Sequence, residues 1–419
     1  MFWKTSLVLL ALSLATAGTG VDRKIGISIP LKPRAVLTKD DGTFDHERAA
    51  FETYRTEVKH RQNLINLERN VGRIAFSEGA QIKDFIPIPS FKLTKRQGVA
   101  LTDQDDVEWT GPITIGSNAQ KLTINFDTGS SDLWVPNAHD CYGCEGHNTY
   151  DSKTSKTSKS VNGTFTIFYG DGSTVSGPIF KDTVSIAGVK ATNQTFSAVT
   201  ELSQSFNGDP TDGILGLAYP SLSNLKASPY FQTAFAQKAI PKNVFAFKLA
   251  TQGSELFLGG TNSKLFKGAI EQHPVKTGIG FWQIAKGSIH QGGKAVVSGF
   301  ETIIDSGTTI MYGPPDQVKK FYDSVPGAEL YDENNGFYSF PCKSIPKAGF
   351  SWGGKVWAVT PQNFNLGETT QGSGQCVGAL SGTDLGLGNN VWLLGDSFMK
   401  NVYTVFSFAN NTVGYAMLK

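Results

Sequence analysis

Two related stretches decide the fold of this chain: TINFDTGSSDLW at residues 123–134 and ETIIDSGTTIMY at residues 301–312. Each consists of apolar residues followed by Asp, then Thr or Ser, then Gly and a hydroxyl residue. Asp127 and Asp305 therefore stand at the same place in the two copies, between a strand-like run and a turn. An ionised carboxylate avoids such a place unless its surroundings hold it there. Taken alone, either Asp could simply accept hydrogen bonds from the turn of its own lobe.

A second repeated element accompanies each Asp. Two apolar residues and a glycine recur downstream, ending at Gly216 after Asp127 and at Gly395 after Asp305. The two Asp are 178 residues apart and the two Gly are 179 residues apart. Motifs that repeat together at nearly one offset indicate a body made of two homologous lobes. Lobes of this kind pack about a pseudo-two-fold axis, which would bring both Asp to the cleft between them, where ligands bind.

The chemistry of two such carboxyl groups follows from their charge. At a separation of a few Å they cannot both ionise cheaply, so the pair holds one proton. The ionised member can take a proton from a bound water while the protonated member donates to a carbonyl oxygen. We expect Ser130 and Thr308, three residues after each Asp, to hydrogen-bond the outer carboxylate oxygens. Thr128 and Ser306 can instead cross-link the two turns.

The N-terminal residues 1–17 are predicted to be a signal peptide. They contain Lys4, an apolar run over residues 7–14 and the small-residue sequence Ala15-Thr16-Ala17, which is the three-part pattern of a secretory leader. The apolar run is too short to span a membrane, and no membrane anchor is expected elsewhere. We therefore expect secretion, with an extracellular destination favoured over an acidic vacuole.

Charge divides the rest of the chain. Residues 1–96 contain 16 Lys and Arg against 10 Asp and Glu, which leaves 22 against 26 for the remainder. Every Arg lies before residue 97, and the dibasic pair Lys95-Arg96 marks the boundary. We expect a cut there, which makes residues 18–96 a pro-segment. A basic segment on an acidic body can act as its own inhibitor, and Lys59, Arg61 or another cation would reach the carboxyl pair. The body has no basic patch for nucleic acid.

The pattern of apolar residues predicts an all-β body with few helices. Short alternating runs separated by Gly-rich turns continue from residue 97 to the end. We assign residues 97–275 to an N-terminal lobe and residues 276–419 to a C-terminal lobe. In the pro-segment, KIGISIPL is expected to form a strand, and residues 45–70 are expected to form a helix capped by Asp45.

The four cysteines favour disulfides over metal. Cys141 and Cys144 have metal-like spacing, but Cys342 and Cys376 do not form a second close pair. No metal or other cofactor is expected. Because secreted chains meet an oxidising environment, two disulfides are expected, with Cys141–Cys144 and Cys342–Cys376 favoured among three connectivities. Three N-glycosylation sequons also fit secretion; they begin at Asn162, Asn193 and Asn410.

Five stretches together resemble the pepsin-like aspartic proteases, in particular secreted fungal-type members: FDTGSSDLWVP, IIDSGTT, FYGDGS, DGILGLAY and WLLGDSFMKNVYTVFS. The resemblance covers essentially all of residues 97–419. It implies a two-lobed β fold in which Asp127 and Asp305 are the catalytic pair. It also implies an acid endopeptidase, made as a zymogen and acting as a monomer on polypeptides in extended conformation.

The resemblance also gives a role to TFTIFYGDGS at residues 164–173. By itself this stretch predicts a hairpin, and a plain surface hairpin would be the simplest interpretation. In the family the hairpin is a mobile flap over the cleft. Tyr169 then matches the flap tyrosine that hydrogen-bonds Trp134, and Gly170 and Asp171 match positions that hold the substrate backbone. Asp171 also resembles flap residues of fungal relatives that accept a basic residue at the cleavage site.

The main alternative function is a catalytically inactive relative that binds peptides or inhibits an enzyme. Such relatives usually lose an Asp or the Gly beside it, and those positions are intact here: Asp127, Gly129, Asp305 and Gly307. A carbohydrate-binding β protein would explain the composition but not the duplicated Asp turns. Serine-hydrolase chemistry has no G-x-S-x-G sequence to support it.

Overall fold

The computed structural model describes residues 26–33, 37–84, 109–168, 174–203, 206, 209–250 and 252–419. The predicted signal peptide, the dibasic pair and the flap residues Tyr169, Gly170 and Asp171 lie outside these ranges.

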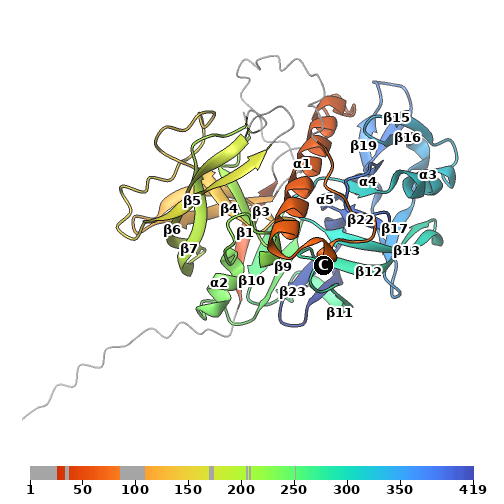
Figure 1. Ribbon diagram of the computed structural model, residues 1–419. Coiled ribbons are helices and arrows are strands. Elements are labelled where there is room, and N and C mark those ends of the chain that lie inside the picture. Colours follow the sequence, from red (N-terminus) through yellow and green to blue (C-terminus); the bar gives the residue numbers. More distant parts are fainter. Residues whose placement is uncertain are drawn as a thin grey trace, which may run out of the picture.

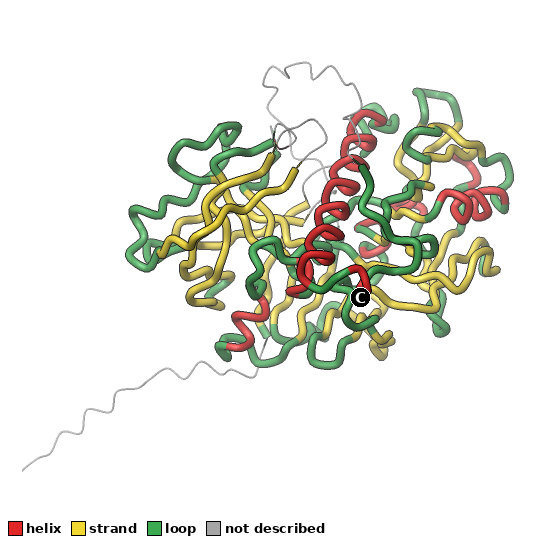
Figure 2. Tube along the Cα trace, in the orientation of Figure 1, coloured by secondary structure: helices red, strands yellow, loops and turns green. Residues whose placement is uncertain are grey.

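Strands dominate the described residues, and the largest sheet they form contains 13 strands (Figures 1 and 2). Its order is β11-β24-β23-β9-β10-β1-β2-β3-β8-β4-β7-β6-β5. The strands are β1 (Ile27–Pro33), β2 (Trp109–Ile115), β3 (Gln120–Asp127), β4 (Leu133–Pro136), β5 (Lys159–Phe168), β6 (Thr174–Ile186), β7 (Val189–Val199), β8 (Gly213–Gly216), β9 (Val244–Lys248), β10 (Ser254–Leu258), β11 (Phe266–Pro274), β23 (Tyr403–Ser407) and β24 (Thr412–Leu418).

The C-terminal half supplies two smaller sheets within the described ranges, of seven and four strands. The first contains β12 (Gln283–Gln291), β13 (Lys294–Ile304), β14 (Met311–Gly313), β17 (Ala348–Ser351), β18 (Trp357–Ala358), β21 (Leu380–Gly382) and β22 (Val391–Leu394). The second contains β15 (Glu329–Asp332), β16 (Phe337–Pro341), β19 (Asn365–Glu368) and β20 (Gln375–Gly378). The expected all-β architecture is confirmed.

The sequence repeat is also a structural repeat. In the N-terminal lobe, β3 pairs in parallel with β8, so that Asp127 lies opposite Gly216. In the C-terminal lobe, β13 pairs in parallel with β22, and the backbone N–H of Asp305 donates to the carbonyl of Leu394, 3.0 Å away. The Asp motif and the glycine motif recur together because they form neighbouring strands in each lobe.

The two halves of the body share strands. The C-terminal strand β23 pairs with β9, which comes from the first half of the chain. Strand β24 then pairs with β11. The predicted boundary between residues 275 and 276 therefore falls beside a sheet to which both halves contribute, and the assignment of 97–275 and 276–419 stays a prediction.

The helices are short apart from one in the predicted pro-segment. Helix α1 (His46–Asn70) lies across the gap between the two lobes (Figure 1). The carboxylate of Asp45 accepts from the backbone N–H of Arg48, which confirms the expected cap. The other helices are α2 (Tyr230–Ala236), α3 (Pro315–Asp323), α4 (Pro361–Phe364) and α5 (Asp396–Met399). None of the described helices has the length and apolar character needed to cross a membrane.

The predicted pro-segment also contributes a strand, as expected from KIGISIPL. Strand β1 lies between β10 and β2 in the large sheet. Residues 27–31 pair antiparallel with β10, and Lys32 and Pro33 pair with Thr110 and Trp109 of β2. Part of the predicted pro-segment is thus built into the sheet of the body rather than resting on it.

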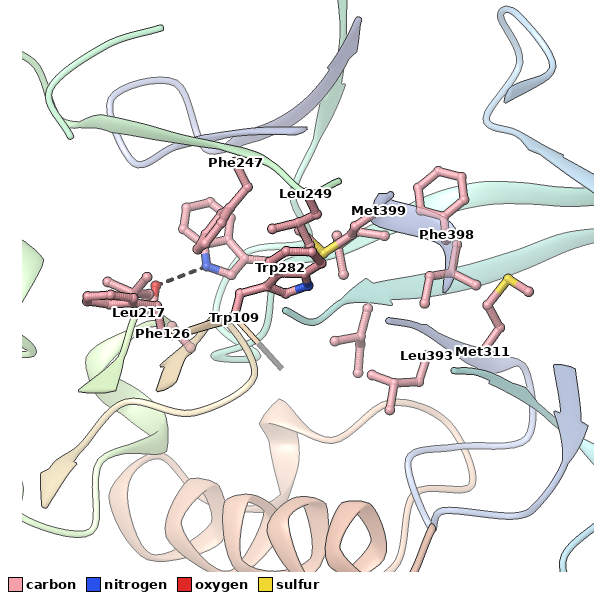
Figure 3. Packing of buried hydrophobic residues seen from close by; sticks show 14 of the residues in the cluster. Trp109, Phe126, Leu217, Phe247, Leu249, Trp282, Met311, Leu393, Phe398 and Met399 are labelled. Atoms are coloured by element: carbon pink, nitrogen blue, oxygen red, sulfur yellow. Dashed lines mark hydrogen bonds between the residues drawn. The ribbon is translucent and has the colours of Figure 1, made fainter. Parts of the chain in front are cut away.

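The main hydrophobic cluster of the described residues contains side chains from both lobes (Figure 3). Trp282 is fully buried, and its indole N–H donates to the carbonyl of Leu217, 3.1 Å away. Phe126, the residue before the first Asp, is also fully buried. Apolar burial of this extent stabilises the strand ends that hold the two Asp.

The cysteines pair as expected, Cys141 with Cys144 and Cys342 with Cys376. The sequon residues Asn162, Asn193 and Asn410 are exposed, which leaves them accessible to modification. Their glycosylation stays a prediction.

Candidate active site

The first Asp turn is held by its own hydrogen bonds. Asp127 ends β3, and its Oδ1 accepts from the backbone N–H of Gly129 at 2.9 Å. Its Oδ2 accepts from the hydroxyl of Ser130 at 2.5 Å. Asp127 is 1% exposed. Both carboxylate oxygens of a buried side chain are therefore satisfied within the turn, as the sequence predicted for Ser130.

The second turn repeats this arrangement. Asp305 follows β13, and its Oδ1 accepts from the backbone N–H of Gly307 at 2.8 Å. Its Oδ2 accepts from the hydroxyl of Thr308 at 2.8 Å. The predicted role of Thr308 matches this contact. Each Asp thus accepts hydrogen bonds from its own turn, as the simple structural interpretation expects. Further hydrogen bonds join the two turns.

Thr128 and Ser306 connect the turns in both directions. The hydroxyl of Thr128 donates to the carbonyl of Ile304 at 3.0 Å and accepts from the backbone N–H of Ser306 at 2.9 Å. The hydroxyl of Ser306 donates to the carbonyl of Phe126 at 2.7 Å and accepts from the backbone N–H of Thr128 at 3.1 Å. This symmetric cross-link fixes one Asp relative to the other.

The glycines allow the two turns to approach closely. A Cβ added to Gly129 would lie 2.3 Å from Oδ2 of Asp305. A Cβ added to Gly307 would lie 2.1 Å from Oδ1 of Asp127. Such contacts are far inside van der Waals distance, so any larger residue at either position would force the carboxyl groups apart.

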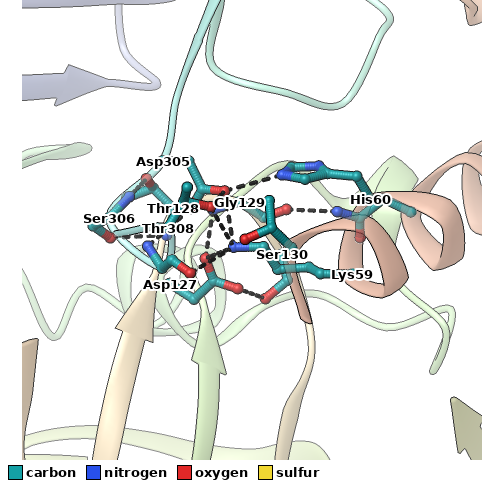
Figure 4. Close-up of polar contacts among 12 residues, drawn as sticks. Lys59, His60, Asp127, Thr128, Gly129, Ser130, Asp305, Ser306 and Thr308 are labelled. Atoms are coloured by element: carbon teal, nitrogen blue, oxygen red, sulfur yellow. Dashed lines mark hydrogen bonds and ion pairs between the residues drawn. The ribbon is translucent and has the colours of Figure 1, made fainter. Parts of the chain in front are cut away.

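A lysine from the predicted pro-segment bridges the pair (Figure 4). The Nζ of Lys59, on α1, lies 3.2 Å from Oδ1 of Asp127 and 2.8 Å from Oδ2 of Asp305. It also donates to the carbonyl of Gly307 at 3.0 Å. A single ammonium within reach of both carboxyl groups shows directly that Asp127 and Asp305 meet in the cleft.

Two neighbours of Lys59 complete the contact. The Nε2 of His60 lies 3.2 Å from Oδ2 of Asp305, and the His60 side chain is fully buried. The side-chain amide of Asn63 donates to the carbonyl of Gly129 at 2.8 Å. Helix α1 therefore covers the space in front of the carboxyl pair with three polar side chains.

The pKa values of the two Asp side chains are shifted in opposite directions. Burial raises the pKa of Asp127 to about 6, against the opposing charge of Lys59. Burial would also raise the pKa of Asp305, but Lys59 and the hydrogen bond from His60 bring it well below its usual range. The two carboxyl groups titrate as a pair, and together they retain one proton in weak acid. Their charges in turn raise the pKa of Lys59 in spite of its burial.

The sequence left open which pro-segment cation reaches the site, and the structure answers with Lys59. Arg61 points elsewhere and donates to the carbonyl of Lys83 at 2.7 Å. Which of these two cations faces the carboxyl pair depends on how the helix is rotated about its axis against the body. The local sequence carries no signal for that rotation. His60 and Asn63 were missed for the same reason.

The predicted partner of the flap, Trp134, is 3% exposed and packs edge-on against Phe206, with 5.1 Å between ring centroids. Its expected hydrogen bond with Tyr169 involves a residue outside the described ranges. Within those ranges no group of three or more His, Cys, Asp and Glu could hold a metal ion.

Comparison with known proteins shows the family of the chain. The family model described as eukaryotic aspartyl protease matches residues 108–418. The chain belongs to this family. Its members are aspartic-type endopeptidases, which are hydrolases, and this chain is one of them.

Individual relatives of this aspartyl protease agree. It is 44% identical to an aspartic protease of Phaffia rhodozyma over 324 residues, which cover 75% of this chain and 78% of the relative. It is 36% identical to cathepsin D of Bos taurus over 336 residues, 74% of this chain and 85% of the relative. It is 32% identical to pepsin A of Sus scrofa over 373 residues, 85% of this chain and 92% of the relative. The expected pepsin-like family is confirmed.

Proposed function

We propose that this chain is the zymogen of a secreted endopeptidase that works in acid, with Asp127 and Asp305 as its catalytic pair. The observation that carries the proposal is the cross-linked pair of turns, in which two buried carboxyl groups share one ammonium. The proposal includes an enzyme that acts as a monomer. It also includes polypeptide substrates in extended conformation, because the carboxyl pair lies at a cleft between the lobes.

The proposed reaction needs only the pair and a water. The ionised carboxyl takes a proton from the water, whose oxygen adds to the amide carbonyl carbon, while the protonated carboxyl donates to the carbonyl oxygen. The tetrahedral intermediate then collapses, the C–N bond breaks, and the amine leaves with a proton from the pair. Ser130 and Thr308 keep the carboxyl groups oriented through both steps.

Acid dependence follows from the retained proton. The pKa of Asp127, about 6 with Lys59 in place, sets the upper limit at which the pair keeps its proton. Removal of the helix takes away both the positive charge of Lys59, which lowers this pKa, and part of the burial that raises it. Activity should be lost as the pH rises above the pKa at which the pair gives up its proton.

Self-inhibition is supported by the position of α1. Lys59 occupies the place between the carboxyl groups where the attacking water would have to lie, and Asn63 contacts the same turn. The basic leader sequence and the predicted cut after Arg96 fit a precursor that is secreted and then trimmed.

The test is digestion of a denatured protein at acidic pH by the activated chain, with and without a statine-type transition-state mimic. Asp305→Asn should lower the cleavage rate by about 10²–10⁴-fold, because it removes the base and the shared proton. Asp323→Asn, which changes an exposed carboxylate on α3, is the matched control and should keep full activity.

Cleavage that the mimic does not inhibit, or full activity in Asp305→Asn, would overturn the mechanism. A protein that binds the mimic but cuts nothing would support the inactive peptide-binding alternative instead.

A further inference from the structure

Helix α1 places a second cation in the cleft besides Lys59. Arg55 lies one turn before Lys59, about 6 Å along the helix axis. Both side chains line a cavity of about 70 Å³ that also touches Asp127 and Trp134. Arg55 therefore occupies space beside the carboxyl pair that becomes available to a substrate once the pro-segment is removed.

The body holds this guanidinium with two different groups. The guanidinium carbon of Arg55 lies 4.7 Å from the centroid of the Phe206 ring. One terminal nitrogen lies 3.5 Å from Oδ2 of Asp209. A terminal nitrogen of Arg55 also lies 3.5 Å from the carboxylate of Glu52. Because Glu52 is part of helix α1, this contact would be lost together with the helix. An aromatic face beside a carboxylate suits a planar cation in particular.

Both groups also have contacts within the body. Phe206 is 3% exposed and packs against Trp134 with the rings at 82°. The Asp209 side chain is 2% exposed. Its Oδ1 accepts from the backbone N–H of Thr211 at 2.9 Å and from the Thr211 hydroxyl at 2.6 Å, which leaves Oδ2 turned toward Arg55.

We propose that Phe206 and Asp209 form a subsite that prefers an arginine side chain of the substrate, close to the bond that is cut. The proposal rests on the proposed function and narrows its substrate class. Arginine is preferred over lysine because the guanidinium is planar, stacks on a ring and is less strongly hydrated than an ammonium.

The distribution of arginine along the chain fits this preference. All eight Arg lie within residues 1–96, whereas the remainder has 22 Lys and no Arg. A protease with this subsite finds its preferred side chain throughout its own leader and nowhere in its lobes. It would therefore cut released pro-segments in preference to other copies of itself.

The test uses mature enzyme, prepared from the full chain, and four fluorogenic peptides that differ at one position near the scissile bond: Arg, Lys, citrulline or Leu. Citrulline has the shape of arginine without its charge. We expect kcat/KM for the Arg peptide to exceed that for the citrulline peptide by about tenfold, with the Lys peptide between them. The position of the substitution is scanned along the peptide, and one position should carry the effect.

Three variants locate the preference. Asp209→Asn should bring the ratio of kcat/KM for Arg over citrulline close to one, and Phe206→Leu should lower it independently. Asp171→Asn tests the flap residue as a rival source of the same preference. The exposed Asp323→Asn should leave the ratio unchanged.

Equal cleavage of the Arg and citrulline peptides by wild-type enzyme would overturn the subsite. So would a preference that persists in both Asp209→Asn and Phe206→Leu, or one that only Asp171→Asn removes. Because the Leu peptide reports cleavage without the subsite, its hydrolysis separates failure of this inference from failure of the proposed function, in which no peptide would be cut.

Discussion

Thr128 carries two hydrogen bonds through one hydroxyl, and both cross from one lobe to the other. Its methyl group and hydroxyl are fully buried, as is Ser306 opposite. A buried backbone group that loses its partner keeps the full cost of leaving water. Neither turn alone explains why Thr128 and Ser306 carry hydroxyl groups. The reason becomes visible only when the two copies of the motif are compared.

Thr128→Val tests the cross-link with little change in volume. It leaves the N–H of Ser306 and the carbonyl of Ile304 without this partner. We expect the full chain to lose about 1–3 kcal/mol of stability, measured as a lower urea midpoint.

The matched control is Thr404→Val. Thr404 is also fully buried, but its hydroxyl has no hydrogen-bond partner among the described residues. The same substitution there should leave the midpoint unchanged or raise it. A midpoint for Thr128→Val that equals that of Thr404→Val would show that the cross-link contributes nothing to stability.

Helix α1 shows what the sequence can and cannot predict about an element. Its existence and its start follow from local features, namely the apolar spacing and the Asp45 cap, and both are confirmed. Its contacts do not follow, because they depend on how the helix is rotated and placed against the body. Lys59 faces the carboxyl pair and Arg61 does not, although both are cations two residues apart.

His60 should make the docking of this helix sensitive to pH. Burial, with a smaller effect of Lys59, lowers the pKa of His60 in the docked helix. In a released helix the value returns to about 6.5. Below that pH the released form takes up a proton that the docked form resists, so docking weakens as the pH falls. Glu57, whose pKa is raised to about 7 by burial, acts in the opposite sense.

We expect His60→Gln to shift the onset of self-activation to lower pH, because the variant has no proton to take up. The measurement is the appearance of mature chain on a gel after incubation at a series of pH values. His139→Gln is the control, since His139 pairs with Asp151 on the body and not with the helix. An onset that stays the same in His60→Gln would assign acid activation to carboxyl groups alone.

At the scale of the whole molecule, the duplication made the fold predictable. Two lobes, the meeting of Asp127 and Asp305 and the all-β class all follow from one repeated pattern. The subsite of Phe206 and Asp209 does not follow from it, because nothing in the local sequence shows that a helix from residues 46–70 will place Arg55 there. Strand pairing across the halves, such as β23 with β9, is likewise a property of the assembled sheet.

The position of β1 predicts how the chain refolds. A chain that begins at Gln97 lacks the strand between β10 and β2 and should regain little activity on dilution from denaturant, compared with the full chain followed by activation. Ile29→Asp, which places a charge at a buried position of β1, should reduce recovery in the full chain. Lys32→Asp at an exposed position of the same strand should not. Equal recovery with and without residues 18–96 would contradict the prediction.

That strand has a consequence for the lifetime of the enzyme. Removal of residues 18–96 at the predicted cut would leave the edges of β10 and β2 without the strand that pairs with them, and that strand would no longer be part of the chain. Unfolding of the mature protein would then be a one-way event. Its lifetime would be set by an unfolding rate rather than by an equilibrium between folded and unfolded chains.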